Sequence, residues 1–277
     1  MEDRGTTEIM SGIILRWLGG GGGDTIMNLL SHSNNVYTNI VATNNIDPVT
    51  GRSLIKVKLD EEHPNLHDMA LVPLTKTIDN VALKQDIVNL VNKKDSFILK
   101  MHYWDKDFDN EISDVVEIVD IGCTLAFIPF IVTANLNKTP TLDNSKIKDK
   151  THFDKDLFKM AEKLTDEQNK MVVTWNIITD MIKKTRVFGL EDAPITTEDL
   201  FYNKNHLKTF FQNKSFTFDP ESDYLDQWVE NNKKFLPGQT FQNYIKNTKY
   251  DYMDDSLQMV ERYTLLALSG KNFQFLG

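Results

Sequence analysis

Short runs of apolar residues alternate in the first half of the chain with segments whose apolar residues follow helical spacing. Residues 12–18 (GIILRWL) and 96–101 (SFILKM) are continuous apolar runs with the length and branching typical of buried strands. Residues 115–121 (VVEIVDI) form a third such run, which ends at Gly122. Strands that are apolar on both sides are typical of parallel sheets covered by helices on both faces. The pattern therefore predicts an α/β fold with a central parallel sheet.

Segments whose apolar residues follow helical spacing lie between these strands. Residues 24–30 carry an apolar face directly after the first strand, and residues 79–93 repeat apolar positions three and four apart, with Asp79 or Asn80 as the N-cap. Further helices are predicted over residues 124–135, 154–184, 203–211, 223–232 and 256–268. Strands separated by helices predict right-handed crossovers, with ligands at the carboxyl ends of the strands.

The region between residues 37 and 77 is rich in turn-forming residues, and only a strand over 54–59 is predicted there. His63 and His67 have the spacing of two zinc ligands on one helix face. Pro64 interrupts that spacing and favours a polar loop, so no metal site is predicted. Later in the chain, short strands are predicted over residues 187–190 and 195–200.

The composition is that of a globular protein, with 40% hydrophobic and 26% charged residues among 277. We interpret the chain as a single domain over residues 1–277, with a core over about 9–215 and a helical C-terminal extension over about 216–277. The formal net charge of −9 argues against nucleic acid as a partner, because broad nucleic-acid binding needs a positive surface.

The expected location is the cytoplasm. A single cysteine, Cys123, excludes an intrachain disulfide and fits a reducing compartment. Residues 1–8 are acidic and polar, unlike a signal peptide. Residues 115–136 carry charges and Pro129, which favour a buried strand and helix over a membrane span. We therefore expect no membrane association, and the oligomeric state stays open.

A run of five glycines, Gly19 to Gly23, joins the first predicted strand to the first predicted helix. Glycines let several backbone N–H groups point inward, and the helix adds its positive end, so this turn is suited to a phosphate or another anion. Asp24 stands where a Walker loop has lysine, which disfavours hydrolysis of ATP or GTP with Mg²⁺. The alternative is that the glycines form only a tight turn and that Asp24 caps the helix.

This turn, together with a later strand that ends in Lys100-Met101-His102, resembles the 3′-phosphoadenosine 5′-phosphosulfate (PAPS)-dependent sulfotransferases. The resemblance implies a P-loop-like three-layer fold and PAPS as the co-substrate. Six residues take the place of the family loop that holds the 5′-phosphosulfate: Gly20, Gly21, Gly22, Gly23, Asp24 and Thr25. The family strand ending K-[ST]-H implies that His102 is the general base that removes the proton from the acceptor hydroxyl.

Two later segments resemble the same family. Residues 195–201 (ITTEDLF), with the helix predicted after them, are similar to its Y-E-D-L segment. Trp228 and Asn231 resemble its W-x-x-x-[NH] element, with a spacing one residue short. The loop lacks the family's lysine or arginine, and the third strand lacks its arginines for the 3′-phosphate. Whether Arg16, Arg52 or a distant lysine supplies that charge stays open.

The chemistry of the residues agrees with a transfer site. Histidine titrates near neutral pH and can accept a proton from a hydroxyl, and Lys100 lies two residues before His102, on the same face of a strand. Lys100 could therefore stabilise a transferring sulfuryl or phosphoryl group. The alternative for His102 is a structural histidine at a strand end. Asp120 could bind a ribose hydroxyl, a metal or the acceptor, or could cap the next helix.

These observations favour an enzyme that moves a sulfuryl group from a nucleotide donor to a hydroxyl or amine of a small-molecule or glycan acceptor. A phosphoryl-transfer enzyme is a close variant and would need bound Mg²⁺. A second hypothesis is a binding or structural protein that keeps the fold without catalysis. A third is a glycosyltransferase, because its glycine loops also hold nucleotide phosphates.

Overall fold

The computed structural model describes residues 12–17, 21–33, 36–48, 51–71, 79–93, 96–102, 105–123, 127, 130–131 and 193–236. The helices predicted over 154–184 and 256–268 and the strand predicted over 187–190 lie outside these ranges, as does most of the helix predicted over 124–135. Gly20, one of the predicted loop residues, also lies outside them.

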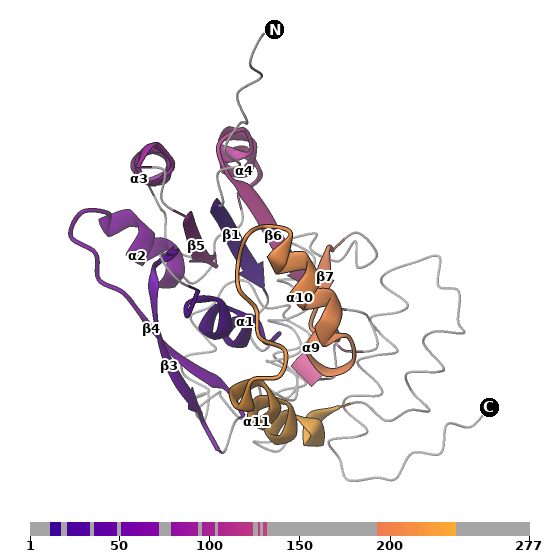
Figure 1. Cartoon of the computed structure of the whole chain (residues 1–277). Helices are drawn as coiled ribbons and strands as arrows, with labels where there is room; N and C mark the ends of the chain where they lie inside the picture. Colours follow the sequence, from indigo (N-terminus) through magenta and orange to yellow (C-terminus); the bar gives the residue numbers. More distant parts are fainter. Residues whose placement is uncertain are drawn as a thin grey trace, which may run out of the picture.

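The centre of the fold is a parallel sheet of five strands in the order β2-β5-β1-β6-β7, which confirms the predicted α/β class (Figure 1). In that order the strands are β2 (Val36–Thr38), β5 (Ser96–Met101), β1 (Gly12–Trp17), β6 (Glu117–Gly122) and β7 (Ile195–Thr196). β1 is the middle strand, and its Ile14 is aligned with Leu99 of β5 and Ile118 of β6. β6 starts two residues later than predicted, and β7 is shorter than the predicted strand.

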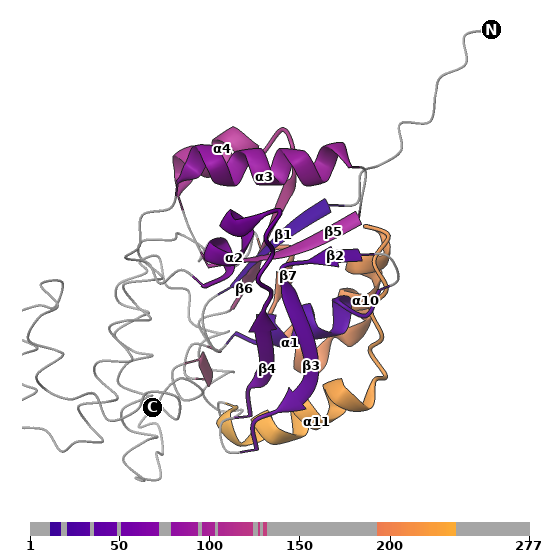
Figure 2. The ribbon, with the colours of Figure 1, turned by 90° about the vertical axis from the view of Figure 1, so that its left-hand side faces the viewer.

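Helices cover both faces of the sheet (Figure 2). One face carries α2 (Pro64–Leu71), α3 (Asn80–Asn92) and α4 (Lys106–Ile112). The other face carries α1 (Gly23–Leu30), α9 (Asp199–Tyr202) and α10 (Lys204–Gln212). An antiparallel hairpin of β3 (Ile40–Ile46) and β4 (Ser53–Val57) packs on the outer side of α1, together with α11 (Asp223–Asn232) and a short 3-10 turn (Lys233–Phe235).

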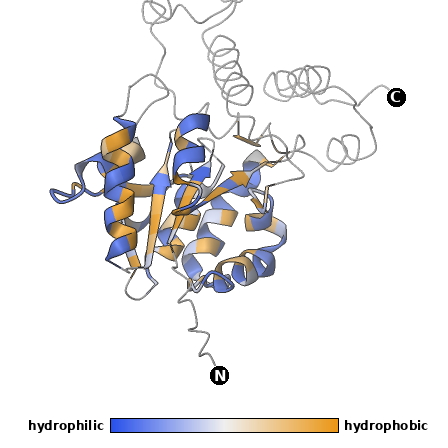
Figure 3. Ribbon diagram, turned by 90° about the horizontal axis from the view of Figure 1, so that it is seen from above, coloured by the Kyte–Doolittle hydropathy of each residue, from blue (hydrophilic) through white to orange (hydrophobic). Residues whose placement is uncertain are grey.

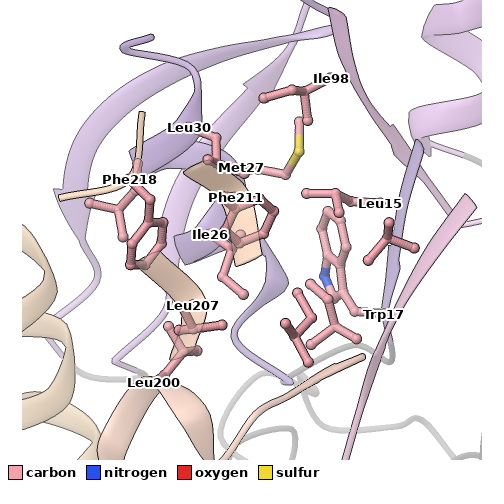
Figure 4. Packing of buried hydrophobic residues seen from close by; sticks show 14 of the residues in the cluster. Leu15, Trp17, Ile26, Met27, Leu30, Ile98, Leu200, Leu207, Phe211 and Phe218 are labelled. Carbon is pink, nitrogen blue, oxygen red and sulfur yellow. The ribbon is translucent and has the colours of Figure 1, made fainter. Parts of the chain in front are cut away.

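Alternate residues of β1 supply two hydrophobic clusters, one on each face of the sheet. Ile13, Leu15 and Trp17 join α1, α9 and α10 in the larger cluster, part of which Figure 4 shows. Ile14 joins α2, α3 and α4 in the other. Figure 3 shows hydrophobic strands between helices that are banded with hydrophobic and hydrophilic residues. Phe218 belongs to the larger cluster, so the segment after α10 packs into the core.

Several local predictions hold. α3 begins after Asp79, whose carboxylate accepts hydrogen bonds from the backbone N–H groups of Val81 and Ala82 at 3.1 Å. α10 lies within one residue of its predicted bounds, and α11 has the bounds that its spacing predicts.

Other local predictions are wrong. The polar loop expected around His63 and His67 is helix α2, because Pro64 occupies the first helical position, where its missing N–H costs nothing. Asp24 does not cap α1: the N-cap residue is Gly22, and Asp24 lies inside the first turn. In the part of the chain that the structure describes, no helix combines the length and the apolar character needed to cross a membrane.

Candidate functional site

The connections of the two neighbouring strands β1 and β5 leave the sheet on opposite faces. β1 leads into α1, which packs in the larger cluster, and β5 leads toward α4, which packs in the other. In open α/β sheets, ligands bind at the carboxyl ends of the strands where successive connections diverge in this way. The glycine turn and the end of β5 meet at this position.

The glycine turn is held tightly by its surroundings. Gly22 has a φ of 77°, and its carbonyl oxygen accepts hydrogen bonds from Thr25 N at 2.9 Å and Ile26 N at 3.2 Å. A Cβ atom at Gly22 would lie 2.4 Å from Leu200 Cδ1. The Thr197 hydroxyl lies 2.9 Å from the carbonyl oxygen of Gly21 and so joins the turn to the segment between β7 and α9. The left-handed backbone conformation, together with the close approach of Leu200, therefore favours glycine at position 22 whether or not an anion binds.

Lys100 and Asp24 form an ion pair at the start of α1. The Lys100 ammonium lies 3.0 Å from Asp24 Oδ1 and 5.4 Å from the centroid of the Trp17 ring, and the Lys100 side chain is 9% exposed. The Asn39 side chain fixes the backbone of Lys100, accepting from its N–H at 2.8 Å and donating to its carbonyl oxygen at 3.0 Å. The strand therefore presents a buried cation to the first turn of the helix.

The pKa of the Asp24 carboxyl reflects this pairing. Burial alone would raise that pKa, but the charge of Lys100, the charge that His102 carries when it is protonated, the hydrogen bond from Lys100 and the charge of Arg52 lower it below the ordinary value of 3.8. Asp24 is therefore a carboxylate at neutral pH. A carboxylate in the first turn also interacts favourably with the positive end of the helix dipole.

His102 lies beside the same tryptophan. Its ring centroid is 5.2 Å from that of Trp17, with an angle of 67° between the two ring planes, and its backbone N–H donates to Met69 O at 3.2 Å. Burial and the nearby charge of Lys100 lower the pKa of His102 to about 4, although Asp24 and a hydrogen bond with the Trp17 backbone act in the opposite direction. The imidazole is neutral at pH 7 and can accept a proton.

Arg52 brings a further positive charge to this region, since its charge acts on the pKa of both Asp24 and His102. It follows Gly51, which has a φ of 66°. The side-chain amide of Asn232 donates to the Gly51 carbonyl at 2.7 Å and to the Trp228 carbonyl at 2.8 Å. α11 thus holds the loop that carries Arg52.

Asn232, rather than Asn231, is the buried asparagine of α11. The Asn231 side chain donates to the Gln227 carbonyl at 3.0 Å within the helix, whereas Asn232 is 2% exposed and contacts the distant Gly51 loop. Asn232 lies four residues after Trp228, which is the spacing of the W-x-x-x-[NH] element, whereas Asn231 lies one residue too early for it.

Arg16 points away from this site. Its guanidinium bonds Asp109 of α4 at 2.7 Å and Asp120 of β6 at 2.7 Å. Burial opposes the charge, but these two carboxylates raise the pKa of Arg16 above its ordinary value. Arg16 and Asp120 therefore neutralise each other on the α4 face, while Lys100 and His102 contact Trp17 on the α1 face.

The remaining predicted residues have other surroundings. The fully buried Thr25 hydroxyl lies 2.6 Å from Ser53 Oγ, between α1 and the hairpin. Within the described ranges there is no group of three or more His, Cys, Asp and Glu side chains able to hold a metal ion, His63 and His67 included. Burial and the charge of Glu198 raise the pKa of the buried Cys123 thiol well above its ordinary value, which fits a filling role.

Comparison with family models, with curated proteins and with solved structures gives no match for this chain.

Proposed function

We propose that this protein is a sulfotransferase-like enzyme, which binds an anionic nucleotide donor, PAPS, between the ends of β1 and β5 and transfers its sulfuryl group to a hydroxyl or amine. One observation supports this most strongly: Lys100, His102 and the glycine turn converge at the carboxyl ends of two adjacent parallel strands around Trp17. A glycine turn that leads from the central strand into a helix also fits the P-loop-like arrangement.

Each group has a role in this proposal. The backbone N–H groups at the start of α1 and the Lys100 ammonium bind the transferring group and the donor phosphate. The acceptor oxygen forms a bond to sulfur, and the bond from sulfur to the donor's 5′-phosphate oxygen breaks, leaving adenosine 3′,5′-bisphosphate. The neutral His102 takes the acceptor's proton. A base of such low pKa is weak. The charge of Asp24 already acts to raise that pKa, so the donor has to bring more negative charge than Asp24 does to move it toward the useful range.

The first test is a thermal-shift titration with adenosine 3′,5′-bisphosphate, run beside ATP with Mg²⁺ and UDP. A ligand at 100 times its dissociation constant stabilises the folded state by about 2.7 kcal/mol. We expect a shift with the bisphosphate that is lost in Lys100→Met and kept in Lys56→Met, a matched control on the exposed side of β4. A shift with ATP and Mg²⁺ alone would instead favour phosphoryl transfer, and a shift with UDP alone would favour a glycosyltransferase.

The second test separates binding from chemistry. His102→Gln removes the proposed base while leaving Lys100 and Asp24 in place, so we expect it to keep bisphosphate binding and to lose transfer of labelled sulfate from PAPS to an acceptor. Removal of a general base lowers the rate by about 10²–10⁴-fold. Unchanged turnover in this variant would remove His102 from the mechanism and leave it a structural residue against Trp17.

One observation favours the second candidate, a binding or structural protein that keeps the fold without catalysis. The charge of Lys100 is already matched by Asp24. If no nucleotide shifts the melting temperature, that pair is a structural element of the core and the transferase proposal is wrong.

A further inference from the structure

The position that an anion would take at the start of α1 faces a carboxylate of the chain itself. Asp24 is the second residue of α1, directly after the glycine turn. Its side chain is 23% exposed, and it accepts a hydrogen bond from the ammonium of Lys100 at 3.0 Å. The carboxylate thus interacts with the helix terminus and with the lysine, and the charge of Arg52 also acts on it.

Lys100 cannot readily lose this partner. Its side chain is 9% exposed and its ammonium lies against the Trp17 ring, so water replaces a lost carboxylate only poorly. Its backbone is fixed by Asn39, which keeps the ammonium aimed at the first turn of α1. For Lys100 to keep its charge, an anion is therefore needed beside it, from either the chain or a ligand.

We infer that Asp24 is an internal competitor for the donor site: its carboxylate occupies the place of the donor's anionic group and must leave Lys100 for that group to bind. This inference rests on the proposed function for the identity of the donor. Asp24 thereby sets how tightly the site holds an anion. The lowered pKa of the Asp24 carboxyl supports it, because the competitor stays charged at neutral pH.

The competition follows from charge. A sulfate or phosphate oxygen bound to Lys100 while Asp24 remains would place two negative groups against the same ammonium in a poorly solvated site, and of the described cations only Arg52 adds further positive charge there, so this arrangement is unfavourable. Removing the Asp24 carboxylate leaves the cation and the helix terminus for the ligand. The same change leaves a buried ammonium unpaired in the free protein, so the variant needs an external anion more than the wild type does.

The test uses inorganic sulfate as the probe and the melting temperature of the full chain as the readout. We expect Asp24→Ala to melt below the wild type without sulfate and to regain stability as sulfate is added, against a titration with sodium chloride at equal ionic strength. The expected gain in sulfate affinity over the wild type is about 10- to 100-fold, which corresponds to one hydrogen bond to a charged group. If Asp24→Ala folds only in the presence of sulfate, that result also supports the inference.

Two variants make the result specific. Asp24→Asn keeps the shape and removes the charge, so it provides the same measurement if the alanine variant does not fold at any sulfate concentration. Glu117→Gln is the control. Glu117 pairs with Lys214 at the amino end of β6, whereas the site lies at the carboxyl ends of the strands, so removal of this negative charge should give no gain in sulfate affinity. Equal sulfate affinity in the wild type and in the folded Asp24 variants would overturn the inference.

Failure of the Asp24 inference can be distinguished from failure of the proposed function. Nucleotide binding by the wild type without any gain in sulfate affinity in the Asp24 variants leaves the transferase proposal standing and the competitor role wrong. A gain in sulfate affinity without nucleotide binding gives the reverse conclusion.

Discussion

The indole ring of Trp17 fills the space in which a side chain at Gly23 would lie: a Cβ atom built on Gly23 falls 2.0 Å from Trp17 Cδ2. Gly23→Ala therefore forces the ring or the first turn of α1 to move, and we expect a loss of about 1–3 kcal/mol in the free energy of unfolding. Urea unfolding monitored by tryptophan fluorescence measures it. In a Trp17→Leu background the same substitution should cost much less, whereas equal costs in both backgrounds would show that the contact is unimportant.

The Arg16 network predicts a larger effect on stability. Arg16→Met leaves Asp109 and Asp120 facing each other without their shared cation, and we expect a loss of about 3 kcal/mol, as for other broken ion pairs that are largely buried. Adding Asp109→Asn to this variant should recover part of that loss, since one of the two like charges is removed. No recovery would mean that the arginine acts through its packing alone.

The link between α11 and the Gly51 loop predicts a contrast between neighbouring asparagines. Asn232→Ala removes the side-chain hydrogen bonds to the carbonyls of Gly51 and Trp228, so we expect a loss of about 1–3 kcal/mol and faster hydrogen exchange around Arg52. Asn231→Ala is the matched control and should be nearly neutral, because the Asn231 side chain donates to the Gln227 carbonyl within its own helix. Equal losses in the two variants would contradict the assignment.

His102 predicts a pH dependence of stability. The pKa of His102 is about 4 in the folded protein against an ordinary value of 6.5, so between these values the unfolded chain binds a proton that the folded protein does not. Stability should therefore be fully present above about pH 6.5 and should fall by about 2–3 kcal/mol as the pH drops toward 4.

Denaturant unfolding at a series of pH values measures this effect, and His102→Gln should flatten the curve in that window. The Asp24 carboxyl, whose pKa is lowered from 3.8, contributes stability that is lost only at more acidic pH. An unchanged slope between pH 6.5 and 4 in the variant would assign the dependence to other groups.

Elements with a continuous or periodic apolar pattern were predictable from the sequence, and the others were not. β1, β5, α3 and α11 have such patterns and form as expected. α4 has only two buried apolar residues, Phe108 and Ile112, in a single charged stretch, too few to establish a period. The strand predicted over 54–59 overlaps β4, but β3 and its turn into β4 depend on residues such as Asn44, with a φ of 52°, whose conformation the apolar pattern does not show.

Part of the candidate site could also be predicted from the sequence, and part could not. Two-residue spacing on a strand predicts that Lys100 and His102 share a face, and both contact Trp17. The partner of Lys100 could not be predicted, because Asp24 reaches it only through the pairing of β5 with β1. The separation of Arg16 from the site could not be predicted either, because it depends on α4, which brings Asp109 to the opposite face of the sheet.

β1 contributes apolar side chains to the clusters on both faces of the sheet. If the helices of one face detached, they would expose apolar side chains of β1, the strand against which the helices of the other face also pack. The two layers should therefore unfold as one cooperative unit. β1 ends at Trp17, which supports Lys100, His102 and Gly23. Exchange of the β1 and β5 amides should accordingly require nearly global unfolding, so that the geometry around Lys100 persists for as long as the molecule is folded.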